Sequence, residues 1–452
     1  MTLRVLHYSD IENAYDDPER VGQLAGTIEA RRDDRTVVVG TGDNTAPGVL
    51  ALQTEGRQAL DLFRAIEPDL ETFGNHDFDF GPGPLRDLVA DAPQRWVCAN
   101  AHEADGEGRF AGADPTAVIE RGGARVGFVG MIDPDTPAIS GVETSLATTD
   151  PVTAVREHLP RLRERADHVV VLAHLRAESE RAIARLDGVD ALLGGHVHEE
   201  RCDRIDGTLC LRPGANGRVV WEVELGKRAT ATRHAVADGR IDESVAAALR
   251  DRMAETGLTE VVGTVAEPIV RERRRRYGGE CRIANLVTDA YRWATGADAG
   301  FVQTGGVRDG PPLSGEVTAA DLVGVSPFGG SVRVVALSGD ELRELVAHSF
   351  APEEIERSHW RQWFGHFSGL RVRYHREEEE IREVRIGGDR PDPDAEYALA
   401  TNAYAVETEF GPLSPDRVVH EWGRPQYEAI VEYVRKEGLD VELDGRLSAV
   451  DG

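Results

Sequence analysis

Short apolar runs alternate with segments of helical spacing through the first half of the chain. The runs are rich in Val, Leu and Ala, and several are too apolar to have one solvated face, which is typical of strands buried on both sides. They lie at residues 3–7, 37–40, 70–73, 96–99, 126–130, 169–173 and 189–193. The alternation predicts an α/β fold with these strands inside.

Local signals mark where the helices between these strands begin. Asp17 and Asp150 each precede a proline, the pairing of an N-cap residue with proline at the first helical position. Thr54 precedes a stretch of helical spacing at 55–66. These signals predict three helices that begin directly after the three residues.

The character of the chain changes after the first half. Runs at 208–212 and 219–225 are separated by turn residues and predict a β-hairpin, and a helix is expected at 241–256. The predicted domains are residues 1–228, a linker and connecting helix at 229–260, and a second domain at 261–452 with helices near 285–293, 340–350 and 426–436. The acidic run Glu377 to Glu380 is expected to be a solvated turn without a function of its own.

The composition is strongly acidic. The chain has 52 basic and 80 acidic residues, a net charge of -28, and Lys227 and Lys436 are its lysines. Such a surface repels nucleic acid and anionic membranes, so a phosphate-bearing substrate would depend on local metals and arginines. The composition resembles that of halophilic archaeal proteins. At 1 M salt the Debye length is about 3 Å, so the repulsion between the carboxylates of such a surface is screened.

Cysteine usage and the start of the chain bear on location. Cys98, Cys202, Cys210 and Cys281 show no CxxC spacing, which favours reduced and mostly buried thiols. The first residues enter a strand without the features of a signal peptide, and no apolar run approaches the roughly 20 residues of a membrane span. The sequence therefore predicts a cytoplasmic protein without a membrane, nucleic-acid or protein partner.

Residues Gly74 to Gly81, GNHDFDFG, form a loop between a strand and a helix. Asn75 offers a carbonyl oxygen to a metal, His76 a titratable imidazole, and Asp79 a carboxylate able to orient that ring. On its own, a loop of this composition more often serves as a turn than as a catalytic site. Its interpretation depends on the residues that follow the other strands.

Potential metal ligands follow five of the predicted strands. They are Asp10 and Glu12, Asp43, Asn75 with His76, His174, and the pair His196 and His198. Taken singly, such an Asp is usually a helix cap and such a His a packed core or surface residue. Because ligands of open α/β sheets bind outside the carboxyl ends of strands, the repetition predicts one shared site.

The same blocks resemble a known family. SDIEN at 9–13, GTGDN at 40–44, GNHDFD at 74–79, the histidine at 174 and GGHVH at 194–198 are similar to the signature of the 5'-nucleotidase family of calcineurin-like metallophosphoesterases. ECRIANLVTDA at 280–290, QTGGVRDG at 303–310, SPFGG at 326–330 and FGHFSGLRV at 364–372 resemble its C-terminal domain. The resemblance implies an N-terminal calcineurin-like domain of sheets flanked by helices and a C-terminal α/β domain that binds nucleotide.

The resemblance also implies a ligand set for two divalent metal ions. The first ion would be held by Asp10, Glu12, Asp43 and His198, and the second by Asp43, Asn75, His174 and His196. Asp43 would bridge the pair, since two dications about 3.5 to 4 Å apart need negative charge between them. A water activated by the metals would attack phosphorus, while His76, positioned by Asp79, would stabilise the transition state or protonate the leaving oxygen.

One ligand departs from the family pattern. The family usually has histidine where this chain has Glu12, so the first site becomes more anionic. Hard carboxylate ligands favour manganese or magnesium over zinc, with zinc and iron as the alternatives. The competing interpretation is an impaired first site.

On the substrate side the resemblance implies Arg308 as the phosphate-binding arginine, with Phe364 and Tyr404 as stacking aromatics. Gln303 replaces the usual Asn, and either ring is equally consistent with a core position. A further substrate arginine of the family has no exact counterpart; Arg282 and Arg276 are the candidates. Arg276 also belongs to a run at 271–276 that suits a surface ion-pair cluster.

The family's ribose-binding Asp is missing, with Glu407 and Glu409 as possible substitutes. The predicted activity is hydrolysis of nucleoside 5'-monophosphates. A 2',3'-cyclic nucleotide phosphodiesterase or a nucleotide-sugar hydrolase would use the same chemistry. A protein of another class, a nucleotide binder that has lost catalysis, is the remaining alternative.

Overall fold

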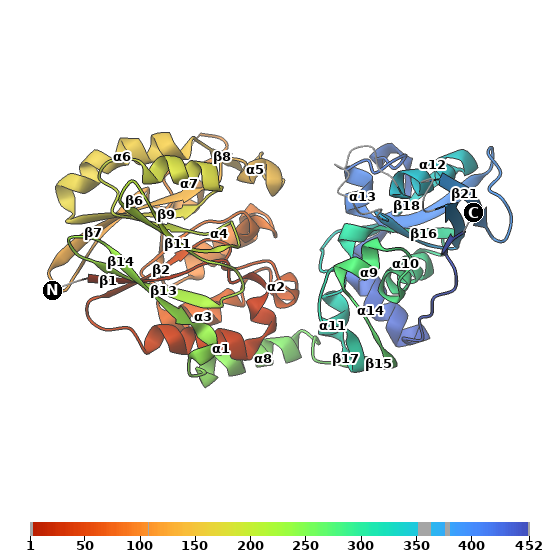
Figure 1. Cartoon of the computed structure of the whole chain (residues 1–452), viewed down its shortest axis with the longest axis horizontal. Helices are drawn as coiled ribbons and strands as arrows, with labels where there is room; N and C mark the ends of the chain where they lie inside the picture. Colours follow the sequence, from red (N-terminus) through yellow and green to blue (C-terminus); the bar gives the residue numbers. More distant parts are fainter. Residues whose placement is uncertain (1–2, 107, 351–362, 376–379, 451–452) are drawn as a thin grey trace. The chain divides into compact units, whose positions relative to one another are not determined.

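The computed structural model describes residues 3–106, 108–350, 363–375 and 380–450. These residues divide into two compact units, residues 1–256 and 257–452. Figure 1 shows that each unit contains both sheets and helices, as the α/β prediction requires.

The first unit contains two six-stranded sheets. In order across the first sheet the strands are β14 (Thr230–Ala235), β13 (Val219–Leu225), β1 (Leu3–Tyr8), β2 (Thr36–Thr41), β3 (Leu70–Thr72) and β4 (Arg95–Trp96). In the second sheet they are β11 (Glu200–Ile205), β12 (Thr208–Pro213), β10 (Ala191–Gly194), β9 (His168–His174), β7 (Ala124–Ile132) and β6 (Thr116–Arg121). The strands from β1 to β4 are parallel, as are β7, β9, β10 and β12, so their carboxyl ends lie along one edge of each sheet.

The two sheets pack face to face. Val5 and Val39 of the first sheet and Phe128 and Leu172 of the second belong to one buried cluster. Helices cover the outer faces, with α6 and α7 over the second sheet and α1, α3 and α8 along the first (Figure 1). The helices of this unit are α1 (Pro18–Glu29), α2 (Val49–Thr54), α3 (Ala59–Ile66), α4 (Pro82–Asp91), α5 (Thr136–Ile139), α6 (Pro151–Arg165), α7 (Ala177–Ala184) and α8 (Glu243–Glu255), and the short strands β5 (Ala101–Glu103) and β8 (Leu146–Thr148) pair with each other.

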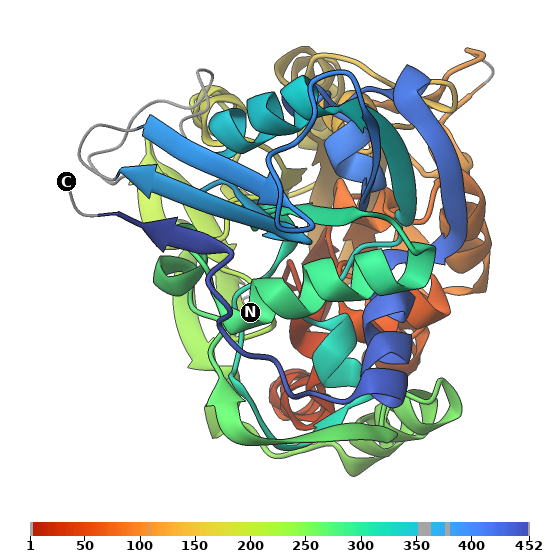
Figure 2. The same cartoon turned by 90° about the vertical axis from the view of Figure 1, so that its right-hand side faces the viewer.

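The second unit is built around a five-stranded sheet, in the order β19 (Gly365–Ser368), β16 (Ala299–Gln303), β22 (Glu396–Asn402), β18 (Ser331–Ser338) and β23 (Val418–Pro425). Strands β21 (Glu380–Ile386), β20 (Leu370–His375) and β24 (Leu447–Ala449) lie side by side in a separate sheet (Figure 2), and β15 (Val261–Ile269) pairs with β17 (Leu313–Thr318). The helices are α9 (Arg273–Tyr277), α10 (Arg282–Thr295), α11 (Ala319–Val323), α12 (Gly339–Phe350), α13 (Ala403–Glu407) and α14 (Gln426–Glu437).

The predicted β-hairpin at the end of the first half is wrong. Residues 208–213 and 219–225 are both strands, but β12 pairs with β10 and β11 whereas β13 pairs with β1 and β14. The turn at 213–217 therefore carries the chain from one sheet to the other. Apolar content identified both strands correctly, but it carries no information about which strand each one pairs with.

Two further boundaries differ from those expected from the sequence. A helix does not begin after Thr54: α2 ends there, and Glu55 and Gly56 adopt left-handed φ values of 51° and 81° before α3 begins. Residues 229–256 do not form a separate linker, because β14 extends the first sheet and α8 packs on α1. Of the acidic run, residues 377–379 lie outside the described residues, and Glu380 is the first residue of β21.

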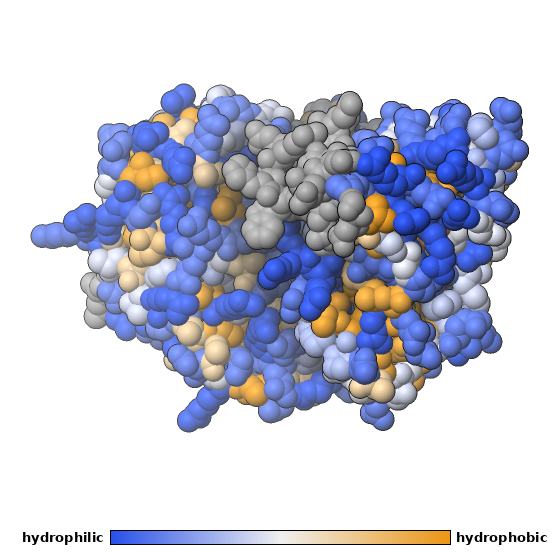
Figure 3. All heavy atoms as spheres, turned by 45° about the vertical axis from the view of Figure 1, so that its right-hand side comes forward, coloured by the Kyte–Doolittle hydropathy of each residue, from blue (hydrophilic) through white to orange (hydrophobic). Residues whose placement is uncertain are grey.

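The polarity of the surface and the state of the cysteines can be compared with what the sequence predicts. Hydrophilic side chains cover most of the face seen in Figure 3, with apolar side chains scattered among them. All four cysteines are free; Cys98, Cys210 and Cys281 are buried, whereas Cys202 is exposed. Within the ranges given above, none of the helices has the length and apolar character needed to span a bilayer.

Candidate metal centre

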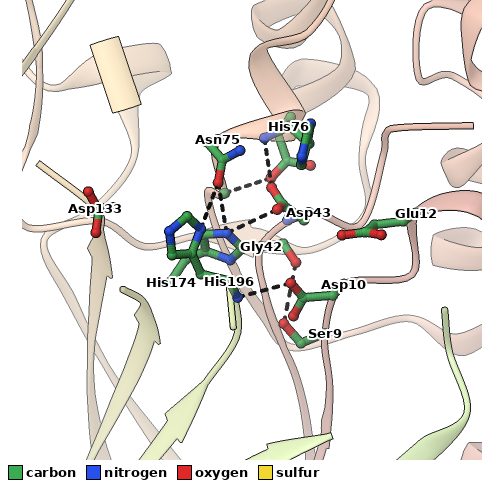
Figure 4. Close-up of polar contacts among 12 residues, drawn as sticks. Ser9, Asp10, Glu12, Gly42, Asp43, Asn75, His76, Asp133, His174 and His196 are labelled. Atoms are coloured by element: carbon green, nitrogen blue, oxygen red, sulfur yellow. Dashed lines mark hydrogen bonds and ion pairs between the residues drawn. The ribbon is translucent and has the colours of Figure 1, made fainter. Parts of the chain in front are cut away.

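The side chains that follow five strands of the first unit meet at the carboxyl edge of its two sheets. Asp10, Glu12, Asp43 and Asn75 follow β1, β2 and β3 of the first sheet, whereas His174 ends β9 and His196 and His198 follow β10 of the second. Two groups form: Asp43 with His174 and His196, and Asp10 with Glu12 and His198. In each group one ligand atom of every residue lies within 4.8 Å of the others. In Figure 4 the side chains of Asn75 and Asp43 point toward the imidazoles of His174 and His196, and Asp10 and Glu12 lie on the other side of Asp43.

In the first of these groups one hydrogen bond fixes the orientation of an imidazole ring. The Nδ1–H of His174 donates to the carbonyl of Thr41 at 2.8 Å, so Nε2 is the nitrogen that could bind a cation once it has lost its proton. That Nε2 lies 3.1 Å from Asp43 Oδ2 and 3.3 Å from Asn75 Oδ1. His196 Nδ1 lies 2.9 Å from the same Asn75 oxygen. Two imidazole nitrogens and two oxygens thus converge.

The second group shows how Glu12 takes part. His198 Nε2 lies 2.8 Å from Glu12 Oε1 and 3.7 Å from Asp10 Oδ1. Glu12 is only 3% exposed, and its Oε1 faces the His198 imidazole nitrogen. A carboxylate oxygen and an imidazole nitrogen are both ligands of divalent cations, so the residues present fit a metal. Asp43 belongs to the group of His174 and His196 and not to that of Asp10, Glu12 and His198. Its role as a bridge between two ions therefore stays a prediction.

Electrostatics in this cluster are governed by burial and crowding. Burial, with Asp43 and Glu12 nearby, raises the pKa of Asp10 to about 7. Burial disfavours a charged His174, but the Asp43 carboxylate outweighs it and raises the pKa of His174 to about 10. Burial lowers the pKa of His196 to about 4. Carboxylates packed this closely need positive charge between them, which divalent cations supply.

The ligand loops hold unusual backbone conformations. Asp10, Glu12, Asp43 and His196 have left-handed φ values of 49°, 47°, 53° and 69°. Such values cost energy for residues other than glycine and cluster at functional sites, where the surroundings enforce them. Position 74 requires glycine for lack of space, because a Cβ there would lie 2.2 Å from Asp43 Oδ1.

Asp77 holds two of these loops together. Its carboxylate accepts hydrogen bonds from the backbone N–H groups of Gly74 (2.8 Å), Asp43 (3.1 Å) and Thr45 (3.2 Å), and from the Thr45 hydroxyl (2.7 Å). Sequence reasoning missed this residue. It stands within GNHDFD, but the motif does not tell which of its two aspartates points inward.

His76 lies at the edge of the cluster with Asp79 beside it. Its Nδ1 is 3.0 Å from Asp79 Oδ2, and its backbone N–H donates to Asp43 Oδ1 at 2.7 Å. Burial opposes the charged ring, but the hydrogen bond to Asp79 and the charge of Asp43 outweigh it and raise the pKa of His76 to about 9. The contact with Asp79 therefore favours the protonated ring, which is 37% exposed and able to donate a proton.

A second cluster of candidate residues lies in the second unit. The Arg308 guanidinium sits over the ring of Phe328, 4.7 Å from its centroid. Phe364 and Tyr277 meet edge to face at 5.6 Å, and Tyr404 is 63% exposed. Burial lowers the pKa of Arg308, with Tyr277 and Tyr404 close enough to act on it in the opposite direction.

Comparison with known proteins assigns both units. Residues 3–200 match the model of the calcineurin-like phosphoesterases, and residues 261–411 match that of the 5'-nucleotidase C-terminal domain. The chain belongs to the 5'-nucleotidase family of calcineurin-like phosphoesterases. The fold prediction of two such domains is confirmed.

Individual relatives agree with this assignment. The chain is 25% identical to endonuclease YhcR of Bacillus subtilis over 96% of its own length and 38% of that protein. It is 22% identical to the trifunctional nucleotide phosphoesterase YfkN of the same organism, over 99% of its length and 35% of the relative. The chain thus spans little more than a third of these two proteins. A crystal structure of the 5'-nucleotidase precursor of Thermus thermophilus has the same fold, with a TM-score of 0.72, 24% identity and full coverage of both chains.

The family's substrate arginine has no direct counterpart here, and the structure gives the two candidates other contacts. Arg276 is buried; its Nη1 donates to the carbonyls of Thr304 and Val307, and its Nη2 pairs with Asp309. These contacts hold the loop at 304–309, which contains Arg308. Arg282 donates to the carbonyls of Val441 and Glu267, so its role in substrate binding has no support in these contacts.

The structure also places the other residues of the predicted substrate side. Gln303 ends β16, directly before the turn that leads to Arg308. Glu407, a candidate for the missing ribose carboxylate, instead pairs with Arg333 at 2.9 Å. Phe328 was missed as an individual residue, although the SPFGG block contains it. The pattern could not show that its ring lies under Arg308.

Proposed function

We propose that this protein is a two-metal hydrolase of nucleotide phosphoesters that acts on nucleoside 5'-monophosphates. The observation that carries the proposal is the convergence of two groups of metal-ligand side chains at one sheet edge. The tandem arrangement of a calcineurin-like domain and a 5'-nucleotidase C-terminal domain supports the same substrate class. The names of the relatives, a nucleotide phosphoesterase and an endonuclease, also describe phosphoester hydrolysis.

The ligand set proposed for the first ion is Asp10, Glu12, Asp43 and His198, and that for the second is Asp43, Asn75, His174 and His196. Two bound divalent cations supply Lewis acidity toward a phosphoryl group and an activated water. We favour manganese because Glu12 adds a hard, charged oxygen to the first group, where zinc would prefer a further nitrogen.

The chain's own residues supply the remaining chemistry. His76, held by Asp79, is placed to donate a proton to the leaving oxygen or to stabilise developing charge on phosphate. In the second unit, Arg308 offers a planar fork of donors to an anionic group. Tyr404, which is exposed, and Phe364 are the aromatic rings proposed to stack on a base, and the Phe328 ring supports the Arg308 guanidinium.

The acidic surface supports adaptation to high salt, as in halophilic proteins, so activity should be measured in molar salt. A cytoplasmic location stays a prediction.

The test is phosphate release from AMP, from cyclic AMP isomers and from p-nitrophenyl phosphate, with manganese, magnesium, zinc or EDTA. We expect release that requires metal, is highest with manganese and prefers AMP. His196→Ala should abolish both metal binding and turnover. His102→Ala is the matched control, because His102 lies on β5 and belongs to neither ligand group.

Other outcomes would contradict parts of the proposal. Preference for a cyclic isomer would replace the monophosphate substrate by a phosphodiester. Full turnover of His196→Ala would refute the two-metal centre. No release with any metal, combined with nucleotide binding by calorimetry, would indicate a binding protein instead of an enzyme.

A further inference from the structure

Glu71, in the middle of β3, is a fully buried carboxyl group with neutral partners. The Tyr8 hydroxyl donates to its Oε2 at 2.7 Å, and Asn44 Nδ2 donates to its Oε1 at 2.6 Å. Gly40 passes so close that a Cβ there would lie 2.1 Å from Oε1. Burial raises the pKa of Glu71 to about 8. Burying a carboxyl group costs free energy, so the stability of the core does not explain its presence in this strand.

The partner Asn44 connects Glu71 to the metal-ligand loops. Its Oδ1 accepts the backbone N–H of Ile11 at 3.3 Å, while its Nδ2 donates to Glu71. An amide presents an acceptor on one side and donors on the other. Because Ile11 N–H can only donate, Oδ1 must face it, and Nδ2 then needs an acceptor on the opposite side. Glu71 supplies that acceptor and so holds the amide in one orientation.

The bond to Ile11 acts on a strained part of the centre. Ile11 lies between Asp10 and Glu12, which both have left-handed φ values, and Asn44 directly follows Asp43, which has a third. The backbone N–H of Glu12 also donates to the carbonyl of Asp43 at 3.3 Å, so the two loops are tied together at this point. Figure 4 labels the three carboxylates that these loops carry, those of Asp10, Glu12 and Asp43. Loops in such conformations keep their geometry only when neighbouring groups enforce it.

We propose that Glu71 is a positioning residue for the metal centre, which acts through Asn44 to fix the loops that carry Asp10, Glu12 and Asp43. The inference rests on the proposed two-metal function, because it assigns to Glu71 an effect on how tightly those loops bind cations. Its role is distinct from that of the ligands, since the carboxyl group of Glu71 faces Tyr8, Asn44 and the backbone of Gly42.

The experiment is calorimetric titration of manganese into the metal-stripped full-length chain. Glu71→Met keeps the volume but removes the acceptor, and we expect manganese affinity to fall by about 10- to 100-fold, as for other groups that orient metal ligands. Glu71→Gln keeps an oxygen for Asn44 and offers an NH2 group to the Tyr8 hydroxyl, so its affinity should stay within a few-fold of wild type. Asn44→Leu should lose as much as Glu71→Met, and the double variant should lose no more than either, because the two residues act as one unit.

The control is Val37→Ala, a cavity in the core of the neighbouring strand β2 that leaves the hydrogen-bonded network intact. It should lower stability and leave manganese affinity unchanged. Wild-type affinity in folded Glu71→Met, or additive losses in the double variant, would overturn the proposal. If Glu71→Met does not fold, as judged by circular dichroism, unchanged affinity in Asn44→Leu would overturn it. Absence of manganese binding by the wild type would refute the proposed function and this inference together, whereas wild-type binding with unaffected variants would refute the inference alone.

Discussion

Replacing Asp77 by Asn should destabilise the first unit far more than the loss of one charge suggests. The Oδ2 atom of Asp77 accepts from the N–H groups of Gly74 and Asp43, and Oδ1 accepts from the N–H and hydroxyl of Thr45. An asparagine has only one oxygen, so whichever way it turns, its NH2 group faces one pair of these donors. With the NH2 group toward Thr45, the Thr45 hydroxyl can turn to accept from it and only the Thr45 N–H is left unsatisfied, so the loss is about 1–3 kcal/mol.

Calorimetry of the metal-free chain at about pH 8 would measure this loss, since burial raises the pKa of Asp77 to about 6 and the group is then ionised. For a unit of this size each kcal/mol corresponds to about 2–4 °C, so the transition of the first unit should fall by about 2 °C or more. Asp87→Asn, the same change at an exposed position of α4, should shift it by less than about 0.5 kcal/mol. A shift of Asp77→Asn no larger than that of Asp87→Asn would refute the assignment of these hydrogen bonds.

Three further predictions concern chemistry, the substrate and pH. His76→Ala should lower turnover by about 100-fold or more while manganese stays bound, because the ring contributes a proton and no metal ligand; steady-state kinetics with a near-normal rate would exclude that role. Phe328→Leu should weaken AMP binding in calorimetry more than Phe364→Leu, because the Phe328 ring supports the proposed phosphate-binding arginine, and the reverse order would show that stacking on Phe364 contributes more. Burial raises the pKa of Asp16 in the folded chain to about 6, above its ordinary unfolded value, so wild type binds a proton on folding and should gain stability over Asp16→Asn as the pH falls through that range. The gain between about pH 7 and pH 4 should be about 2 to 3 kcal/mol in urea unfolding, and a pH-independent difference would contradict it.

Features set by neighbours in the sequence were predictable. Asp17 and Asp150 do cap their helices, accepting from the N–H groups of Arg20 and Thr153, because a cap involves residues only three positions apart. The pairing of β12 and β13 was not predictable in the same way. Two consecutive strands with a turn between them look like a hairpin whether they pair with each other or enter different sheets, and the choice depends on partners far away in the sequence.

The candidate site shows the same division. The rule that ligands gather at the carboxyl ends of strands placed Asp10, Asp43 and His174 together, because the strand order along an α/β chain already implies a common edge. Asp77 and Glu71 could not be found this way. Each acts through hydrogen bonds to loops remote in sequence, and nothing in its residue type distinguishes it from a helix cap or a solvated carboxylate.

The origin of the ligands in two different sheets has a consequence for how this unit assembles. Asp43 comes from the first sheet and His174 from the second, and the bond from His174 Nδ1 to Thr41 crosses between them. Neither sheet alone can therefore bind a cation with the full set, and the centre exists only after the two sheets have docked. A cation at 100 times its Kd would then add about 2.7 kcal/mol to that docked state, acting as a reversible cross-link. Removal of the cation by a chelator should destabilise the interface between the two sheets before it affects the interior of either sheet.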